Sequence, residues 1–89
     1  MWYVYFLQLS NGDVYVGSTS DLRRRVRSHE QGQVLSTRSL LPCSLKSYIA
    51  VPTGDQARTL ERYFKSGSGR AFASKRLLAS CVAPSRIPH

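Results

Sequence analysis

The chain is 89 residues long and carries 13 lysines and arginines against 5 acidic residues, a formal net charge of +8. This length accommodates one domain with a small core. The charge favours a polyanionic partner, nucleic acid first and an anionic membrane surface second, although charge alone also fits a merely soluble basic protein. No run approaches the about 18 apolar residues of a membrane span, so we expect no membrane partner and a cytoplasmic location.

The two cysteines, Cys43 and Cys81, lie far apart in the sequence. They form neither a CxxC pair nor a spacing typical of zinc sites. We therefore interpret both as reduced residues that contribute to packing, as expected for a cytoplasmic protein.

Residues 2–17 predict a β-hairpin. Residues 2–9 are almost wholly apolar or aromatic and rich in β-formers, which indicates a strand buried on both faces. The polar segment 10–13, Ser-Asn-Gly-Asp, has turn chemistry, and the strand pattern resumes at Val14.

The type of turn decides whether Tyr5 and Tyr15 lie on the same face of the sheet. A two-residue Asn-Gly turn would place them on opposite faces, because a shift of one residue in register reverses every side chain. A three-residue loop that ends in a left-handed Gly12 pairs Leu9 with Asp13 and places both tyrosines on one face. A shared site needs this second arrangement, and we predict it.

A helix is predicted from near Ser20, where hydroxyls and an acid can cap it, to near Gly32. Arg25 borders its apolar stripe on one side and Arg23 on the other, so helical geometry alone does not choose between them. Arg24 and Arg27 point away. The stripe itself consists of Leu22, Val26 and His29.

The second half of the chain predicts one strand and two helices. Residues 45–51 form the strand, and a helix follows the turn at 52–55. Gly67 to Gly69 are expected to end that helix, and a short helix is expected over about 70–79. The apolar stripe of the longer helix consists of Ala57, Leu60 and Phe64, bordered by Glu61.

These elements together predict an α+β fold, with a small three-stranded mixed sheet flanked by helices. The sheet would consist of the N-terminal hairpin and the strand at 45–51. We expect the domain to span residues 1–80 and residues 81–89 to form a flexible tail.

Several motifs occur in an order that resembles the GIY-YIG nuclease family. The resemblance extends from Tyr3 to about Leu77, and the segment from Tyr63 to Phe72 resembles the small stand-alone members of that family. Each motif alone is common, but the set at this spacing is fairly specific. The motifs are Tyr3-Val4-Tyr5, Tyr15-Val16-Gly17, Arg25 followed by His29, and Glu61 on a downstream helix.

The resemblance implies a divalent-metal endonuclease that hydrolyses DNA phosphodiester bonds. It implies that Tyr15 is the general base and that Tyr5 assists it. It further implies that Arg25 steadies the scissile phosphate and that Glu61 is the sole direct protein ligand of one Mg²⁺ or Mn²⁺ ion. His29 would support proton transfer or phosphate binding.

The chain departs from the family pattern at three points. The first motif reads Tyr-Val-Tyr rather than Gly-Ile-Tyr, but it keeps the functional final tyrosine. Many members carry an asparagine beyond the metal-binding glutamate. The sole asparagine here is Asn11, in the hairpin turn, so Ser66 or Ser68 would have to take the place of that asparagine. Ser18 stands where some members have a lysine.

Tyrosine titrates near pH 10 and is a poor base without help from a cation or a metal-bound water. Arg25 can supply the cation and Glu61 can hold the metal, so the set is chemically coherent as a unit. The alternative is that Tyr5 and Tyr15 are ordinary strand aromatics. Glu61 would then pair with its helical neighbours Arg58 or Lys65.

Further basic residues are predicted to contact the nucleic-acid backbone. Contacts to phosphates position a protein without specifying a sequence, so we expect low sequence specificity and salt-sensitive binding. A partner protein could supply specificity. Two alternatives remain open, a non-catalytic nucleic-acid-binding module and a subunit that lends this domain to a partner. The predicted nucleic-acid-binding residues are Arg23, Arg24, Lys65, Arg70, Lys75 and Arg76.

Overall fold

The computed structural model describes residues 1–76, and the side chains of residues 74–76 lie outside the description. The expected tail at 81–89 and Cys81 also lie outside the described residues. Cys43 is a free, half-buried thiol that packs against the core, as predicted. The elements are β1 (Trp2–Gln8), β2 (Val14–Thr19), α1 (Leu22–Glu30), the 3-10 turn η1 (Arg38–Leu40), β3 (Ser44–Val51), α2 (Gly54–Lys65) and α3 (Gly67–Arg76).

The sheet has the strand order β2-β1-β3, with β1 in the centre. Both neighbours run antiparallel to β1, so the prediction of an α+β fold with three strands is confirmed, but the sheet is antiparallel rather than mixed. The reason is that β2 and β3 point in the same direction with β1 between them, so no parallel pair forms. A bulge in β3 shifts its register between the partners of Phe6 and Leu7.

The predicted three-residue hairpin loop is confirmed. The Leu9 amide donates to the Asp13 carbonyl at 2.8 Å, and Gly12 has φ +90°, the left-handed conformation that glycine tolerates. The resulting register places Tyr5 opposite Gly17 and Leu7 opposite Tyr15. Tyr5 and Tyr15 therefore share a face of the sheet.

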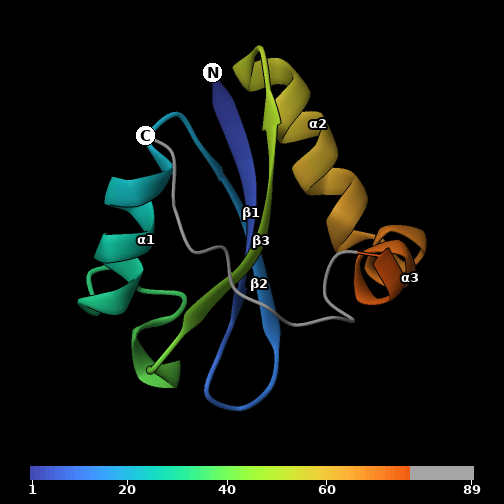
Figure 1. Ribbon diagram of the computed structural model, residues 1–89. Helices are drawn as coiled ribbons and strands as arrows, with labels where there is room; N and C mark the ends of the chain where they lie inside the picture. Colours follow the sequence, from blue (N-terminus) through green and yellow to red (C-terminus); the bar gives the residue numbers. More distant parts are fainter. Residues whose placement is uncertain (77–89) are drawn as a thin grey trace.

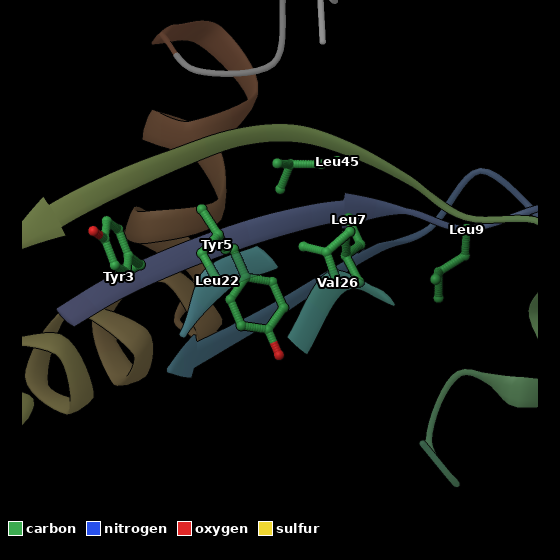
Figure 2. Close-up of a cluster of buried hydrophobic side chains, with 7 residues drawn as sticks. All are labelled: Tyr3, Tyr5, Leu7, Leu9, Leu22, Val26 and Leu45. Carbon is green, nitrogen blue, oxygen red and sulfur yellow. The ribbon is translucent and has the colours of Figure 1, made fainter. Parts of the chain in front are cut away.

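Helices cover both faces of the sheet, with α1 on one side and α2 and α3 on the other (Figure 1). Alternate residues of β1 pack into the cores on the two sides, because successive side chains of a strand point in opposite directions. The core beneath α1 contains Tyr3, Tyr5, Leu7, Leu9, Leu22, Val26 and Leu45 (Figure 2). The core beneath α2 and α3 contains Val4, Phe6, Val16, Ala57, Phe64 and Ala73.

Helix α1 begins at Leu22, two residues later than predicted, because Asp21 rather than Ser20 is the N-cap. The Asp21 carboxylate accepts a hydrogen bond from the Arg24 amide at 3.2 Å. The helix ends before Gly32, which has φ +75° and whose amide donates to the His29 carbonyl. The predicted stripe is confirmed, since Leu22, Val26 and His29 are the buried residues of the helix.

Helix α2 ends at Lys65, so the predicted end of that helix before Gly67 is confirmed. Helix α3 begins at Gly67 rather than near residue 70, so the Gly-Ser-Gly segment is also the first turn of the next helix. The Ser66 hydroxyl caps this turn by accepting from the Gly69 amide at 3.2 Å. Gly69 is required there, because a Cβ atom would collide with the Tyr63 backbone carbonyl of α2. Of the helices that the structure describes, none has the length and apolarity needed to cross a membrane.

Candidate active site

Three aromatic rings meet between β1, β2 and α1. The ring centroids of Tyr5 and Tyr15 are 6.3 Å apart, and the His29 ring lies 5.0 Å from Tyr15 and 5.6 Å from Tyr5. Gly17, opposite Tyr5 in the sheet, leaves room for the phenol, since a Cβ atom there would collide with the Tyr5 hydroxyl. The tyrosine–glycine pairing across the hairpin thus sets the position of the Tyr5 hydroxyl.

A chain of hydrogen bonds runs from the surface into the core through Tyr5. Arg25 Nε donates to the Tyr5 hydroxyl at 3.4 Å, and this hydroxyl lies 3.0 Å from His29 Nε2. On the other side of the ring, His29 Nδ1 lies 2.8 Å from Thr37 Oγ1. Tyr5, His29 and Thr37 are at most 1% exposed, whereas Arg25 is partly exposed.

The surroundings of these hydrogen-bonded side chains determine their protonation states. Burial raises the pKa of Tyr5 to about 12, although the hydrogen bond from Arg25 acts in the opposite direction. Burial and the positive charge of Arg25 lower the pKa of His29 to about 4. The hydrogen bond to Tyr5 raises the pKa of Arg25. At neutral pH the set is therefore a neutral phenol and a neutral imidazole beside one permanent cation.

Glu61 approaches the same region from α2. The Ser18 hydroxyl donates to its Oε1 at 2.6 Å, and Lys65 Nζ donates to its Oε2 at 2.8 Å. Burial acts to raise the pKa of Glu61, but the hydrogen bonds from Lys65 and Ser18 outweigh it and lower the pKa overall. Glu61 is therefore an ionised carboxylate, and its charge contributes to the raised pKa of Tyr5.

Glu61 contacts the edge strand β2 from the side of the sheet opposite to the two tyrosines. Tyr15 and Gly17 face α1, whereas Ser18 lies on the face of Val16, which packs toward α2. Glu61 meets Ser18 of this edge strand from the α2 side. The candidate site thus has parts on both faces of the sheet, and the charge of Glu61 links them through its effect on the pKa of Tyr5.

Comparisons of the sequence and of the structure with known proteins point to the same family. A family model described as the GIY-YIG catalytic domain matches residues 1–75. The chain belongs to the GIY-YIG family. Members of this family are generally nucleases, typically use divalent metals, and act on nucleic acid.

Relatives of this GIY-YIG domain share most of its length. A UPF0213 protein of Cupriavidus pinatubonensis is 32% identical over 78 residues, which cover 83% of this chain and 87% of the relative. A UPF0213 protein of Streptococcus agalactiae is 34% identical over 70 residues, 78% of this chain and 80% of the relative. The solution NMR structure of the UPF0213 protein BH0048 from Bacillus halodurans has a TM-score of 0.56 at 29% identity and covers 90% of both chains.

The donor set at Glu61 fits a magnesium or manganese ion. Within the described part of the chain, no group of three or more His, Cys, Asp or Glu side chains could hold a metal by itself. A single ionised carboxylate such as Glu61 of α2 suits Mg²⁺ once Lys65 turns away from its Oε2, because this ion commonly takes one or two carboxylates and completes its shell with waters and substrate phosphate.

The predicted nucleic-acid-binding residues fall into three groups. Lys65 and Arg70 line a groove of about 560 Å³ that Tyr15 borders, although the Lys65 ammonium is already paired with Glu61. The groove lies on the α2 face of the sheet, because its lining includes Phe6, Val16 and Phe64 of that core. Arg23 and Arg24 are exposed on α1. Lys75 and Arg76 lie in the last turn of α3, where side chains are not described.

Two contacts of this GIY-YIG site had no signal in the sequence. Thr37 lies in an irregular loop eight residues after His29, and no periodic pattern places it beside the imidazole. Ser18 was noted as a departure from the family pattern, but its hydrogen bond to Glu61 depends on how α2 packs at the strand edge. The choice between Arg23 and Arg25 is also structural, because Arg25 is the one that donates to Tyr5.

Proposed function

We propose that this GIY-YIG domain, comprising residues 1–80, is a metal-dependent endonuclease that hydrolyses DNA phosphodiester bonds with low intrinsic sequence specificity. One observation carries the proposal. Tyr5 from β1, Tyr15 from β2 and Arg25 from α1 lie together on one face of the sheet, and the charge of Glu61 from α2 acts on Tyr5 from the other face. These four side chains have the chemistry of the base, cation and metal ligand that phosphodiester cleavage requires, which supports the proposal.

The two tyrosines differ in what they can do. Tyr5 is buried and its pKa of about 12 keeps it protonated, so it serves as a hydrogen-bonding helper. Tyr15 is partly exposed and can contact an attacking water, so we assign it the role of general base. Arg25 keeps its charge and is partly exposed, which suits it to orient the scissile phosphate.

Glu61 would be the one direct protein ligand of a Mg²⁺ or Mn²⁺ ion. Such an ion supplies Lewis-acid stabilisation of the charge that develops on the phosphate. Ser18 holds one carboxylate oxygen in place at 2.6 Å, and Lys65 balances the charge at the other. Lys65 must turn away from Glu61 if it is also to contact DNA.

The surface around the site is suited to a phosphate backbone rather than to bases. Lys65 and Arg70 line the groove on the α2 face of the sheet, and Arg23 and Arg24 are exposed on α1. Such cations position the duplex but carry no sequence information, so a protein partner would supply specificity. The free thiol of Cys43 suits a reducing compartment, and we propose a cytoplasmic location.

The test is cleavage of plasmid, single-stranded and branched DNA by the purified chain, with Mg²⁺, with Mn²⁺ and with chelator. We expect metal-dependent cutting that Glu61→Ala abolishes and that Tyr15→Phe reduces by about 100-fold or more. The matched controls are Glu30→Ala, an exposed acid of α1, and Tyr63→Phe, an exposed tyrosine of α2. Both controls should retain full activity. Cutting that survives in Glu61→Ala would show that the site is wrongly assigned.

A second candidate is a nucleic-acid-binding module without catalysis. It is favoured by the lack of an asparagine after Glu61, since the sole asparagine of the chain is Asn11. Of the two serines considered as substitutes, Ser66 has its hydroxyl engaged in capping α3, which also favours this candidate, and Ser68 is exposed in the first turn of that helix. Salt-sensitive DNA binding with no cutting under any metal condition would establish this candidate instead.

A further inference from the structure

Thr37 is a fully buried residue to which none of the motifs assigns a role. It follows α1 in the loop that returns beneath the helix, and its backbone is held by hydrogen bonds to Val34 and Leu40. Its hydroxyl lies 2.8 Å from His29 Nδ1. Within the described residues, this is the one hydrogen bond of the Thr37 side chain.

The direction of that hydrogen bond follows from the need to satisfy buried groups. If His29 Nδ1 carried the proton and donated it to Thr37, the Thr37 hydroxyl hydrogen would be buried with no acceptor among the described residues. Such an unsatisfied hydrogen is costly in a protein interior. If Thr37 donates to Nδ1, His29 and Thr37 are both satisfied. The hydrogen that then has no acceptor among the described residues is that of Tyr5, which lies beside the partly exposed Arg25 and Tyr15, where an entering group can accept it, and not in the deeper interior beside Thr37. A neutral imidazole then carries its single proton on Nε2.

The tautomer of His29 in turn decides what Tyr5 can do. With a proton on Nε2, His29 donates to the Tyr5 oxygen at 3.0 Å, and Arg25 Nε donates to the same oxygen at 3.4 Å. The phenol then accepts two hydrogen bonds, and its own hydrogen is available to a group that enters the site. With the opposite tautomer, Tyr5 would direct this hydrogen to His29 and away from the substrate.

We propose that Thr37 is a positioning residue, which holds His29 in the Nε2–H tautomer and thereby directs the Tyr5 hydroxyl hydrogen toward the substrate. The catalytic consequence rests on the proposed nuclease function. The tautomer itself is a property of the free protein. His29 is fully buried, so it acts through Tyr5 rather than by touching a phosphate.

The first experiment observes the tautomer directly, by ¹⁵N–¹H correlation of the imidazole ring in full-length protein at neutral pH. The chain has two histidines, so His89→Gln in every sample leaves the His29 signals alone. We expect the proton on Nε2 in this background and in Thr37→Ser, which keeps the hydroxyl. Thr37→Val, which has nearly the same shape, should populate both tautomers. A proton on Nδ1 with Thr37 intact overturns the proposal, even if a Thr37 variant fails to fold.

The second experiment measures cleavage by the same variants. We expect Thr37→Val to lower kcat about tenfold with little change in KM, the effect of about one hydrogen bond, and Thr37→Ser to restore the rate. If Thr37→Val loses stability but keeps the Nε2–H tautomer and full kcat, Thr37 has only a structural role and the proposal is wrong. If the native protein does not cleave DNA, the nuclease function fails, and the ring spectra still decide the tautomer.

Discussion

The two faces of the sheet are built from alternate residues of the same strand, yet they differ in chemistry. Toward α2, β1 presents Val4 and Phe6 to a wholly apolar core. Toward α1, the same strand presents Tyr5 to a region that also buries His29 and Thr37. Within the described residues, no buried side-chain nitrogen or oxygen lacks a hydrogen-bond partner.

Within the one strand β1, the residues that face α2 are thus expected to contribute mainly to stability, and Tyr5, which faces α1, mainly to function. Apolar packing contributes free energy of folding without specifying any chemistry. A buried polar chain brings little net stability but holds its members in one geometry, because each depends on its neighbour for a hydrogen bond. We therefore expect substitutions of adjacent β1 residues to have different consequences.

The largest expected effect is on stability, at Phe6. The Phe6 ring is fully buried, with its centroid 5.0 Å from that of Phe64, so Phe6→Ala should lower the free energy of unfolding by about 3–5 kcal/mol. Tyr5→Phe removes only a hydroxyl and should cost about 1–2 kcal/mol, while reducing cleavage about 100-fold. Urea unfolding and cleavage rates measure the two effects. An equal loss of stability in both variants would contradict the separation of the faces.

The next effect is a pH dependence that arises on the α1 face alone. The pKa of His29 is about 4 in the folded protein against an ordinary value of 6.5, because burial disfavours the cation. Between these values the unfolded chain binds more protons, so stability is fully present above about pH 6.5 and falls as the pH drops toward 4. The gap of about 2.5 units corresponds to about 3 kcal/mol.

Urea unfolding midpoints between pH 7.5 and 4 measure this effect. His29→Gln is the matched variant, and the difference between its pH profile and that of the native protein isolates the imidazole. The carboxylate of Glu61, whose pKa is lowered, contributes stability that is present above its ordinary pKa of 4.5 and is lost as the pH falls below it, and this loss is common to both proteins. Parallel profiles for the two proteins would show that His29 is not the group responsible.

A smaller effect is expected at the junction of the two helices on the α2 face. A Cβ atom at Gly69 would collide with the Tyr63 carbonyl, so Gly69→Ala must displace α3 and should cost about 1–3 kcal/mol. A Cβ atom at Gly67 meets nothing within 4 Å, so Gly67→Ala should be neutral or stabilising by up to about 1 kcal/mol. Cleavage should survive in both variants, since neither glycine contacts Tyr5 or Tyr15. Equal costs at the two positions would show that helix propensity, not contact, governs this junction.

The features that follow local rules were predictable from the sequence. The hairpin register depends on one turn, and Gly12 with its neighbours determines that turn, so the shared face of Tyr5 and Tyr15 could be predicted. The buried stripe of α1 follows from helical periodicity and correctly included His29. These predictions needed only residues close to one another in the chain.

The features that depend on tertiary contact were not predictable in this way. The Gly-Ser-Gly segment is typical of the end of a helix, and only the close approach of Gly69 to α2 shows why a new helix begins there. The strand order places β1 between β2 and β3, which no local pattern encodes. Thr37 reaches His29 through an irregular loop, and Ser18 reaches Glu61 across a strand edge.

The smallest expected effect concerns the exposed cations. Burial and packing on the two faces do not show which of these cations contact DNA. Arg70 lines the groove beside Tyr15, whereas Arg27 is exposed on the outer side of α1. Arg70→Gln and Arg27→Gln remove the same charge, so they form a matched pair. If Arg70 contacts a phosphate, its removal should reduce the slope of log K against log salt by about 0.9, and Arg27→Gln should leave the slope nearly unchanged. Fluorescence anisotropy of labelled duplex DNA, with chelator present to prevent cutting, measures both slopes. Equal reductions would mean that DNA responds to net charge rather than to the groove, and the path of the backbone would then have to be sought on another surface.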